Sequence, residues 1–149
     1  MLRVRIAIDT NLLIAALMRP RGKSARIVRE WLDGRLEVVA SPATVREAEL
    51  VLGGGWLGRM VSREAVRSLL DALRERSLMV EDPPRIRDLR LKDEGDVRMV
   101  ETAVAGGARY VVTTDREFLR QRGYGDVEFV TPDEFLDGFG DRLDNEPGT

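Results

Sequence analysis

The sequence predicts an α/β fold, a three-layer α/β/α sandwich with a central parallel sheet. Strand-like and helix-like segments alternate along the whole chain, the strand-like runs are short and β-branched, and several helices begin at recognisable capping residues. The chain has 149 residues, of which 43% are hydrophobic, and this suits one compact core. We therefore expect a single domain over residues 1–138 and a flexible acidic tail over 139–149.

Six elements are predicted in the first half of the chain, and their ends carry helix signals. They are a strand at 3–8, helices at 10–17 and 25–33, a strand at 36–40, and helices at about 42–52 and 62–76. Ser24 is expected to cap the helix at 25–33. Ser41 followed by Pro42 is a strong helix start, because a capping residue precedes proline at the first helical position. The glycines that begin at Gly53 end that helix.

The second half continues the alternation. The predicted elements are a strand at 78–80, a helix at 94–105, a strand at 109–113, a helix at 115–121, a strand at 127–130 and a short helix from Pro132. Asp96, Val100, Ala103 and Val104 are spaced so that they share one face of the helix at 94–105. This apolar face is expected to pack against the sheet and to bring the Asp96 carboxylate with it.

Carboxylates recur where strands end. Asp9 directly follows the first strand, and Asp115 follows the strand at 109–113. Ligands bind at this carboxyl edge in open parallel sheets. Glu47 lies in the second turn of the helix that leaves the second strand, and Asp96 lies in the first turn of the helix before the strand at 109–113. The topology therefore predicts that these four acids converge at one edge of the sheet.

The residue types that are absent restrict the chemistry of such a site. The chain contains no histidine and no cysteine, which excludes imidazole bases, thiol nucleophiles and Cys/His zinc sites. Clustered carboxylates at neutral pH need a hard divalent cation such as Mg²⁺ or Mn²⁺. Burying Asp96 without a positive group beside it would cost several kcal/mol. The pattern therefore favours a carboxylate site that holds such a cation.

Each acid also has an ordinary structural interpretation when it is considered alone. Asp9 and Asp115 are both placed to cap the helices that follow them, Asp96 can complete a capping box with Asp93, and Glu47 can be a solvated helical residue. Independent caps have no reason to converge on one edge of a sheet, so the four acids together favour a shared site.

The sequence resembles the PIN-domain proteins, a family that includes VapC-like toxins and related nucleases. The matching segments are Asp9–Leu13, Ser41–Glu47, Asp96 with Ala103 seven residues later, and Val111–Asp115. Each segment is short, but their order and spacing agree from about residue 4 to residue 136. The third motif departs slightly, because Val97 and Gly95 flank Asp96 where other residue types are common. This departure leaves open whether Asp93 also helps to hold the metal.

The resemblance implies a metal-dependent ribonuclease that acts on single-stranded RNA, with Mg²⁺ or Mn²⁺ as cofactor. It implies these residues as metal-binding and catalytic acids: Asp9, Glu47, Asp96 and Asp115. It places Thr10, Asn11 and Thr113 in support, although each can also be a local cap or turn residue. It further suggests a small antitoxin protein as partner, which makes the chain the toxin of a type II toxin-antitoxin system.

Two alternatives to a toxin are open at this point. A PIN-domain nuclease that processes RNA without an antitoxin has the same motifs. A receiver-like signalling domain also gathers aspartates at a sheet edge, but it needs a lysine after a late strand, and the chain has only Lys23 and Lys92. A dinucleotide-binding fold is excluded because no glycine-rich turn follows the first strand.

Two further segments suggest contacts with other molecules. Arg19, Arg21 and Lys23 form a dense basic loop that can hold RNA phosphates or can simply be a solvated loop. The segment Trp56–Val61 is too apolar for a free loop. It is expected either to fold back into the core or to form an interface, with a second copy of the chain in a homodimer or with an antitoxin helix.

The bulk composition limits location and partners. The formal net charge of −2 argues against a protein that coats nucleic acid by bulk electrostatics. The sequence shows no apolar stretch long enough to cross a membrane, and the first strand begins too early for a secretory signal. Together with the absence of cysteine, this predicts a cytoplasmic protein.

Overall fold

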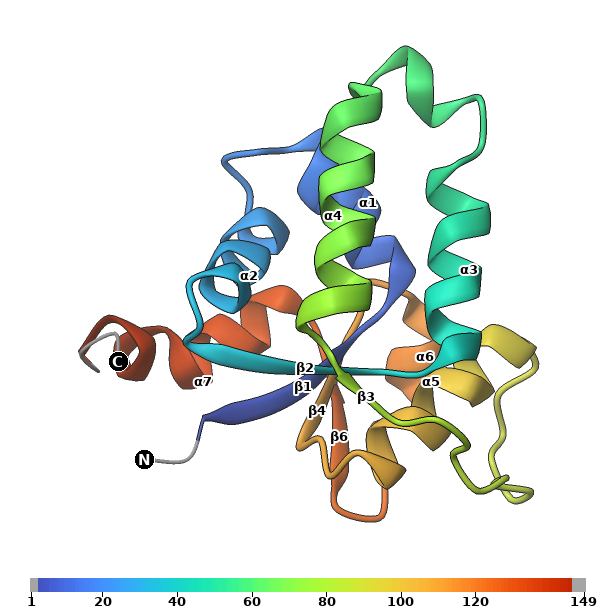
Figure 1. The fold of residues 1–149 in the computed structure, drawn as a ribbon. Helices are drawn as coiled ribbons and strands as arrows, with labels where there is room; N and C mark the ends of the chain where they lie inside the picture. The colour runs from blue at the N-terminus through green and yellow to red at the C-terminus, as the bar shows by residue number, and fades with distance from the viewer. Residues whose placement is uncertain (1–2, 146–149) are drawn as a thin grey trace.

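A mostly parallel sheet forms the centre of the molecule in the computed structural model, which describes residues 3–145 and the side chains up to residue 139 (Figure 1). Its strand order is β3-β2-β1-β4-β6-β5. The strands are β1 (Val4–Ile8), β2 (Leu36–Ala40), β3 (Leu78–Met79), β4 (Tyr110–Val112), β5 (Gly123–Tyr124) and β6 (Val127–Val130). All neighbouring pairs are parallel except β5 with β6. The parallel strands therefore share one carboxyl edge.

Helices cover both faces of this sheet. They are α1 (Thr10–Met18), α2 (Lys23–Leu32), α3 (Pro42–Leu52), the short 3₁₀ helix η1 (Leu57–Arg59), α4 (Arg63–Arg76), α5 (Glu94–Ala105), α6 (Arg116–Arg120) and α7 (Pro132–Asn145). One core packs α1 to α4 and α7 against the sheet, and a second core packs α5 and α6 against the other face. This arrangement confirms the predicted α/β/α sandwich.

Alternation along the strands separates the two cores. In β1, Ile6 and Ile8 belong to the first core, whereas Ala7 belongs to the second. This is the two-residue period of a strand that is buried on both faces. Phe118 of α6 packs edge-to-face on Phe129 of β6, with ring centroids 4.8 Å apart. The second core is thereby closed beside the carboxyl edge of β4.

The helix starts agree with the sequence at α3 but not at α2. Ser41 caps α3, and Thr44 completes a capping box by accepting a hydrogen bond from the Ser41 backbone N–H at 2.9 Å. The prediction that Ser24 caps α2 is wrong. The helix begins at Lys23 after Gly22, and Ser24 is buried inside it. The Gly22 N–H closes a tight turn onto the Arg19 carbonyl at 2.9 Å, and this turn starts the helix earlier than the capping pattern indicated.

Three details of the second half also differ from the prediction. The strand β5 was not predicted, and it requires Arg122 to adopt a left-handed conformation with φ of 63°. Val104 is 42% exposed, whereas Met99 is buried, so the buried face of α5 is rotated from the predicted one. The α7 helix is longer than the predicted short helix and covers part of the expected tail. Residues 146–149 lie outside the described residues.

We find no membrane-spanning helix in residues 3–145. None of the helices in that part of the chain combines the length and the apolar composition needed to cross a membrane.

Candidate functional site

The carboxyl edge of the sheet brings the four predicted acids into one region. Asp9 follows β1, and Asp115 lies three residues after β4, the strand that pairs with β1. The backbone N–H of Asp9 donates to the Val112 carbonyl at 3.0 Å, which ties the two strand ends together. Glu47 lies on α3, which leaves β2 at the same edge. Asp96 lies in the first turn of α5, whose chain then returns to the opposite edge to enter β4.

A threonine links the two acids at the strand ends. The Thr113 hydroxyl donates to Oδ2 of Asp9 at 2.7 Å and accepts from the backbone N–H of Asp115 at 3.0 Å. Thr113 is completely buried, and Asp9 is only 7% exposed. The carboxylate of Asp9 is therefore fixed in orientation by a side chain from the neighbouring strand.

The capping interpretation is correct for some acids and wrong for others. Asp9 precedes α1, but its side chain forms no capping hydrogen bond. Asp115 does cap α6, since Oδ1 accepts from the Glu117 N–H at 2.9 Å. Asp93 caps α5 by accepting from the Asp96 N–H at 3.1 Å. The structure shows only this half of the predicted capping box, so the Asp96 carboxylate is not used as a cap.

Glu47 reaches the start of α5 because a glycine stands there. An added Cβ at Gly95 would collide with both carboxylate oxygens of Glu47. Glu47 is half-buried at this contact, so its carboxylate lies against the first turn of the helix that carries Asp96. Gly95 departs from the PIN pattern in the sequence, and its role is visible only once α3 and α5 are packed together.

The acids raise one another's pKa. Burial first, and then the charges of Asp9, Asp93, Asp115 and Glu47, raise the pKa of Asp96 to about 7. Burial also raises the pKa of Asp9, against the Thr113 hydroxyl and the Thr10 backbone, which lower it. Burial, followed by the charges of Asp93 and Asp9, raises the pKa of Glu47. Asp96 is therefore the acid of this edge with the large rise in pKa, caused first by burial and then by the neighbouring charges.

The described side chains supply no ion-pair partner to Asp96, although a positive group was expected beside it. Among the side chains of residues 3–139, no arginine or lysine forms an ion pair with Asp9, Glu47 or Asp96. An all-oxygen donor set with uncompensated charge fits a hard divalent cation. In the same residues, however, no three acidic side chains are positioned to hold one metal ion. The donor types and the charge fit a metal, whereas the side-chain positions do not form a closed coordination site.

The predicted supporting residues behave differently from one another. Thr113 contacts both Asp9 and Asp115, as described above. Thr10 is buried in the first turn of α1, and Asn11 is exposed. Neither the Thr10 nor the Asn11 side chain forms a hydrogen bond in the part of the chain that the structure describes. Only Thr113 is thus engaged with the acids in this conformation.

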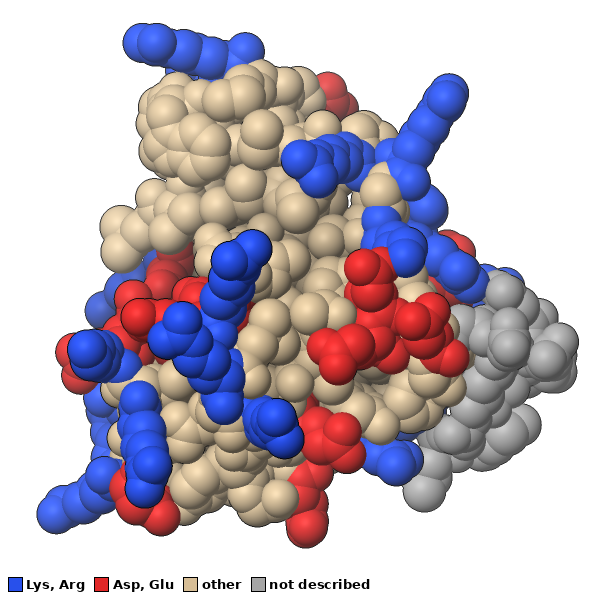
Figure 2. All heavy atoms as spheres, turned by 180° about the vertical axis from the view of Figure 1, so that it is seen from behind, with Lys and Arg blue, Asp and Glu red and all other residues tan. Residues whose placement is uncertain are grey.

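One of the three cations of the basic loop is already paired with an acid of the protein. Lys23 forms an ion pair with Asp133 at the start of α7, and this contact raises the pKa of Lys23. Arg19 and Arg21 are exposed. On the face drawn in Figure 2, basic and acidic side chains lie interspersed rather than forming one continuous basic surface. The loop therefore offers two arginines rather than three free cations.

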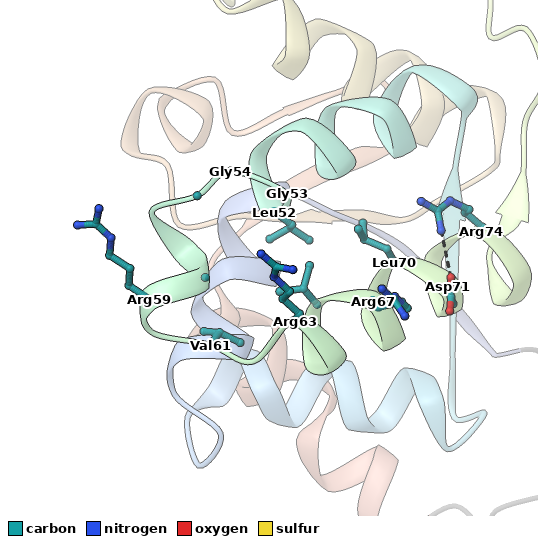
Figure 3. Close-up of a pocket in the computed structure, with 13 residues that line it drawn as sticks. Leu52, Gly53, Gly54, Arg59, Val61, Arg63, Arg67, Leu70, Asp71 and Arg74 are labelled. Atoms are coloured by element: carbon teal, nitrogen blue, oxygen red, sulfur yellow. Dashed lines mark hydrogen bonds and ion pairs between the residues drawn. The ribbon is translucent and has the colours of Figure 1, made fainter.

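The apolar segment Trp56–Val61 is divided between core and surface. Leu57 is completely buried, whereas Trp56 is 48% and Met60 is 60% exposed. The expectation that the segment folds back into the core is correct for Leu57 and, in part, for Val61, which is partly buried and packs against the first core. Beside it, a cavity of ≈ 680 Å³ lies between the end of α3 and α4 (Figure 3).

Glu101 is a buried acid that the sequence reasoning missed. Its side chain is 2% exposed, and it accepts a hydrogen bond from the Ile86 N–H at 2.8 Å and ion pairs from Arg85 and Arg98. These contacts hold the segment 80–93 against α5. A weak signal was present, since Glu101 lies three residues before Val104, a member of the predicted apolar face.

The fold and the site together define a class of protein: an α/β/α sandwich with a mostly parallel sheet and an acidic carboxyl edge. Within that class, the chain belongs to the PIN-domain family, whose sequence pattern matches residues 5–117. The match includes all four predicted acids and confirms the resemblance. A comparison with curated protein sequences finds no significant match.

Several solved structures share the fold. PAE2754 from Pyrobaculum aerophilum is 22% identical with a TM-score of 0.62, covering 96% of this chain and 91% of its own. VapBC2 from Rickettsia felis, bound to a DNA fragment from its promoter, is 15% identical with a TM-score of 0.55, covering 86% and 98%. FitAB bound to an IR36 DNA fragment is 20% identical with a TM-score of 0.58, covering 85% and 94%. At these identities the likeness shows the fold alone.

Proposed function

We propose that the protein is a metal-dependent endoribonuclease that hydrolyses phosphodiester bonds in single-stranded RNA. PIN domains are generally nucleases. The observation that carries the proposal is Asp96, a half-buried carboxyl group beside four other acids that has no ion-pair partner among the described side chains. A site of this kind has a use for the positive charge of a divalent metal ion.

Asp9, Glu47, Asp96 and Asp115 would hold Mg²⁺ or Mn²⁺, with Asp93 as an additional acid. The ion, when bound, lowers the pKa of a coordinated water and neutralises charge on the phosphate. The Thr113 hydroxyl holds the Asp9 carboxylate in one orientation, which is the usual task of a group behind a metal ligand. Burial of Asp9 and Thr113 keeps bulk water away from this part of the site.

The first prediction concerns the metal. Purified protein incubated with a mixed-sequence single-stranded RNA should cleave it with Mg²⁺ or Mn²⁺, and excess EDTA should abolish cleavage. Gel electrophoresis of end-labelled RNA measures the products, and adding metal back after EDTA is the control. Equal cleavage with and without EDTA, or no cleavage with any divalent metal, would contradict the proposal.

We further propose that the chain is the toxin of a toxin-antitoxin pair and acts in the cytoplasm. The support is the fold, which is shared with VapBC2 and FitAB, and a groove suited to a partner helix. The cavity between α3 and α4 has an apolar floor that includes Leu52, Val61 and Leu70. Figure 3 shows Arg63 and Arg67 beside this floor on α4. Apolar and acidic side chains on one antitoxin helix would complement both features.

The neighbouring gene distinguishes a toxin from the alternative function. A neighbouring gene for a small DNA-binding protein would favour a toxin, and its absence would favour an RNA-processing nuclease.

The second prediction concerns assembly with a second copy. Trp56 and Met60 lie next to the groove but outside its lining, and both are exposed. A symmetric pair would cover these large apolar side chains. Light scattering at micromolar concentration should give a dimer mass for the parent and a monomer mass for Trp56→Ser/Met60→Ser. Leu50→Ser is a matched control, because Leu50 is an exposed apolar residue of α3. A monomeric parent, or an unaffected double variant, would exclude this interface.

A further inference from the structure

The segment 80–93 has no helix or strand, yet it is fixed against the domain. Glu101 accepts the Ile86 N–H at 2.8 Å, and the Tyr124 hydroxyl donates to Oδ1 of Asp88 at 2.8 Å. The side chains of Ile86, Leu89 and Leu91 pack on the second core. Residues 86–91 of this segment are therefore held in place, and these contacts fix the backbone that carries its exposed cations.

Two of those cations line a cavity that reaches the acidic edge. The cavity has a volume of ≈ 440 Å³ and lies between the end of the segment and α6. Its lining residues are Arg90, Leu91, Lys92, Asp96, Glu117, Arg120 and Gln121. Asp96 belongs both to this wall and to the acid cluster, so the cavity is directly continuous with the candidate catalytic edge.

The cations of this cavity have no acidic partner in the structure. Among the side chains that the structure describes, those of residues 3–139, Arg90, Lys92 and Arg120 form no ion pair and no side-chain hydrogen bond. Three positive groups therefore share the lining of this cavity with Glu117 and Asp96. An arginine fork binds a phosphate through two parallel hydrogen bonds. The cavity thus has free donors for an anion at its rim and a carboxylate at its inner wall.

We propose that this cavity is a subsite that binds the RNA phosphate next to the one that is cleaved. Arg90 and Arg120 contact the phosphate from opposite walls, Lys92 adds charge, and Asp96 marks the side toward the scissile bond. The inference rests on the proposed function, because the neighbouring phosphate has meaning only if the acidic edge cleaves RNA. It also places substrate binding away from the basic loop of Arg19 and Arg21.

The test compares two double variants that remove the same charge. Arg90→Gln/Arg120→Gln alters the cavity. Arg87→Gln/Arg122→Gln removes one arginine from the same segment and one from just after α6, but neither lines the cavity. Fluorescence anisotropy measures the Kd for a labelled single-stranded RNA and for DNA of the same sequence, and cleavage in Mg²⁺ gives KM and kcat. A third double variant, Arg19→Gln/Arg21→Gln, tests the basic loop as the competing site.

The cavity variant is expected to raise Kd and KM for RNA about tenfold, which is a typical loss for displaced phosphate contacts. Its kcat should stay within about threefold, and the slope of log K against log salt should fall by about 0.7 per lost phosphate contact. The Arg87/Arg122 variant should match the parent. Equal weakening of RNA and DNA is expected, because the subsite reads phosphate.

Several results would overturn the inference. They are an unchanged Kd in the cavity variant, an equal loss in the Arg87/Arg122 variant, or a loss confined to the Arg19/Arg21 variant. Displacement of the RNA by polyglutamate as effectively as by unlabelled RNA would show a general anion site and would also overturn it. A parent that binds RNA through the cavity without cleaving it would contradict the proposed function, and the cavity would then be a phosphate-binding site without a role in cleavage. A parent that cleaves RNA while the cavity variant behaves normally would contradict the subsite alone.

Discussion

Asp9→Asn is expected to lower the rate of RNA cleavage more than 100-fold while the protein stays folded. Losing a group that merely orients a metal ligand typically costs about 10–100-fold in metal affinity or activity, and Asp9 is proposed as the ligand itself. The amide is nearly isosteric and can still accept from the Thr113 hydroxyl, so the buried contact of 2.7 Å has a replacement. Initial rates over a range of Mg²⁺ concentrations measure the loss. We expect similar losses for Asp96→Asn and Asp115→Asn, and a smaller loss for Glu47→Gln.

Asp126→Asn is the matched control for these substitutions. Asp126 is an exposed aspartate at the β5–β6 turn, before β6, and therefore at the opposite edge of the sheet. The same chemical change at this position should leave the rate within about twofold, because surface substitutions away from such features have small effects. Circular dichroism checks that each variant is folded. Normal cleavage by Asp9→Asn would show that the catalytic edge is assigned to the wrong residues.

Asp96→Asn is expected to make the metal-free protein more stable at neutral pH, although it destroys activity. The pKa of Asp96 is about 7 in the folded protein against 3.8 for the free group. Between these pH values the unfolded chain releases the proton and the folded chain keeps it. The parent therefore loses stability as pH rises from 3.8 to about 7, and asparagine, which does not ionise, removes that loss.

The expected gain is about 1 kcal/mol above pH 7, a value discounted because Asp96 is only half-buried and water screens its charge. For a domain of this size that corresponds to a rise in Tm of about 2–4 °C. Thermal unfolding followed in EDTA from about pH 8 to about pH 5 should show the gain shrinking as the pH falls. Adding Mg²⁺ should stabilise the parent more than the variant. A variant that is less stable than the parent at every pH would refute the electrostatic account.

Periodicity and turn chemistry predicted most of the elements. The bounds of β2, α5 and β6 match the predicted ranges, because each has a strong apolar pattern and clear punctuation at its ends. The missed strand β5 pairs through only two residues and depends on the left-handed Arg122. A pairing this short leaves no periodic signal in the sequence.

The sequence by itself determined the sandwich, the order of the four acids and the edge at which they meet. Parallel strands bring whatever follows them to the same edge, so topology alone places Asp9 and Asp115 together. Only the tertiary structure decided how each acid is held: Thr113 orients Asp9, and Gly95 makes room for Glu47. It also decided which cations remain available, since Lys23 is paired with Asp133, whereas Arg90 and Arg120 line the cavity beside Asp96. These facts depend on side chains that are distant in the chain and meet only when helices and strands pack, and a one-dimensional pattern carries no record of such contacts.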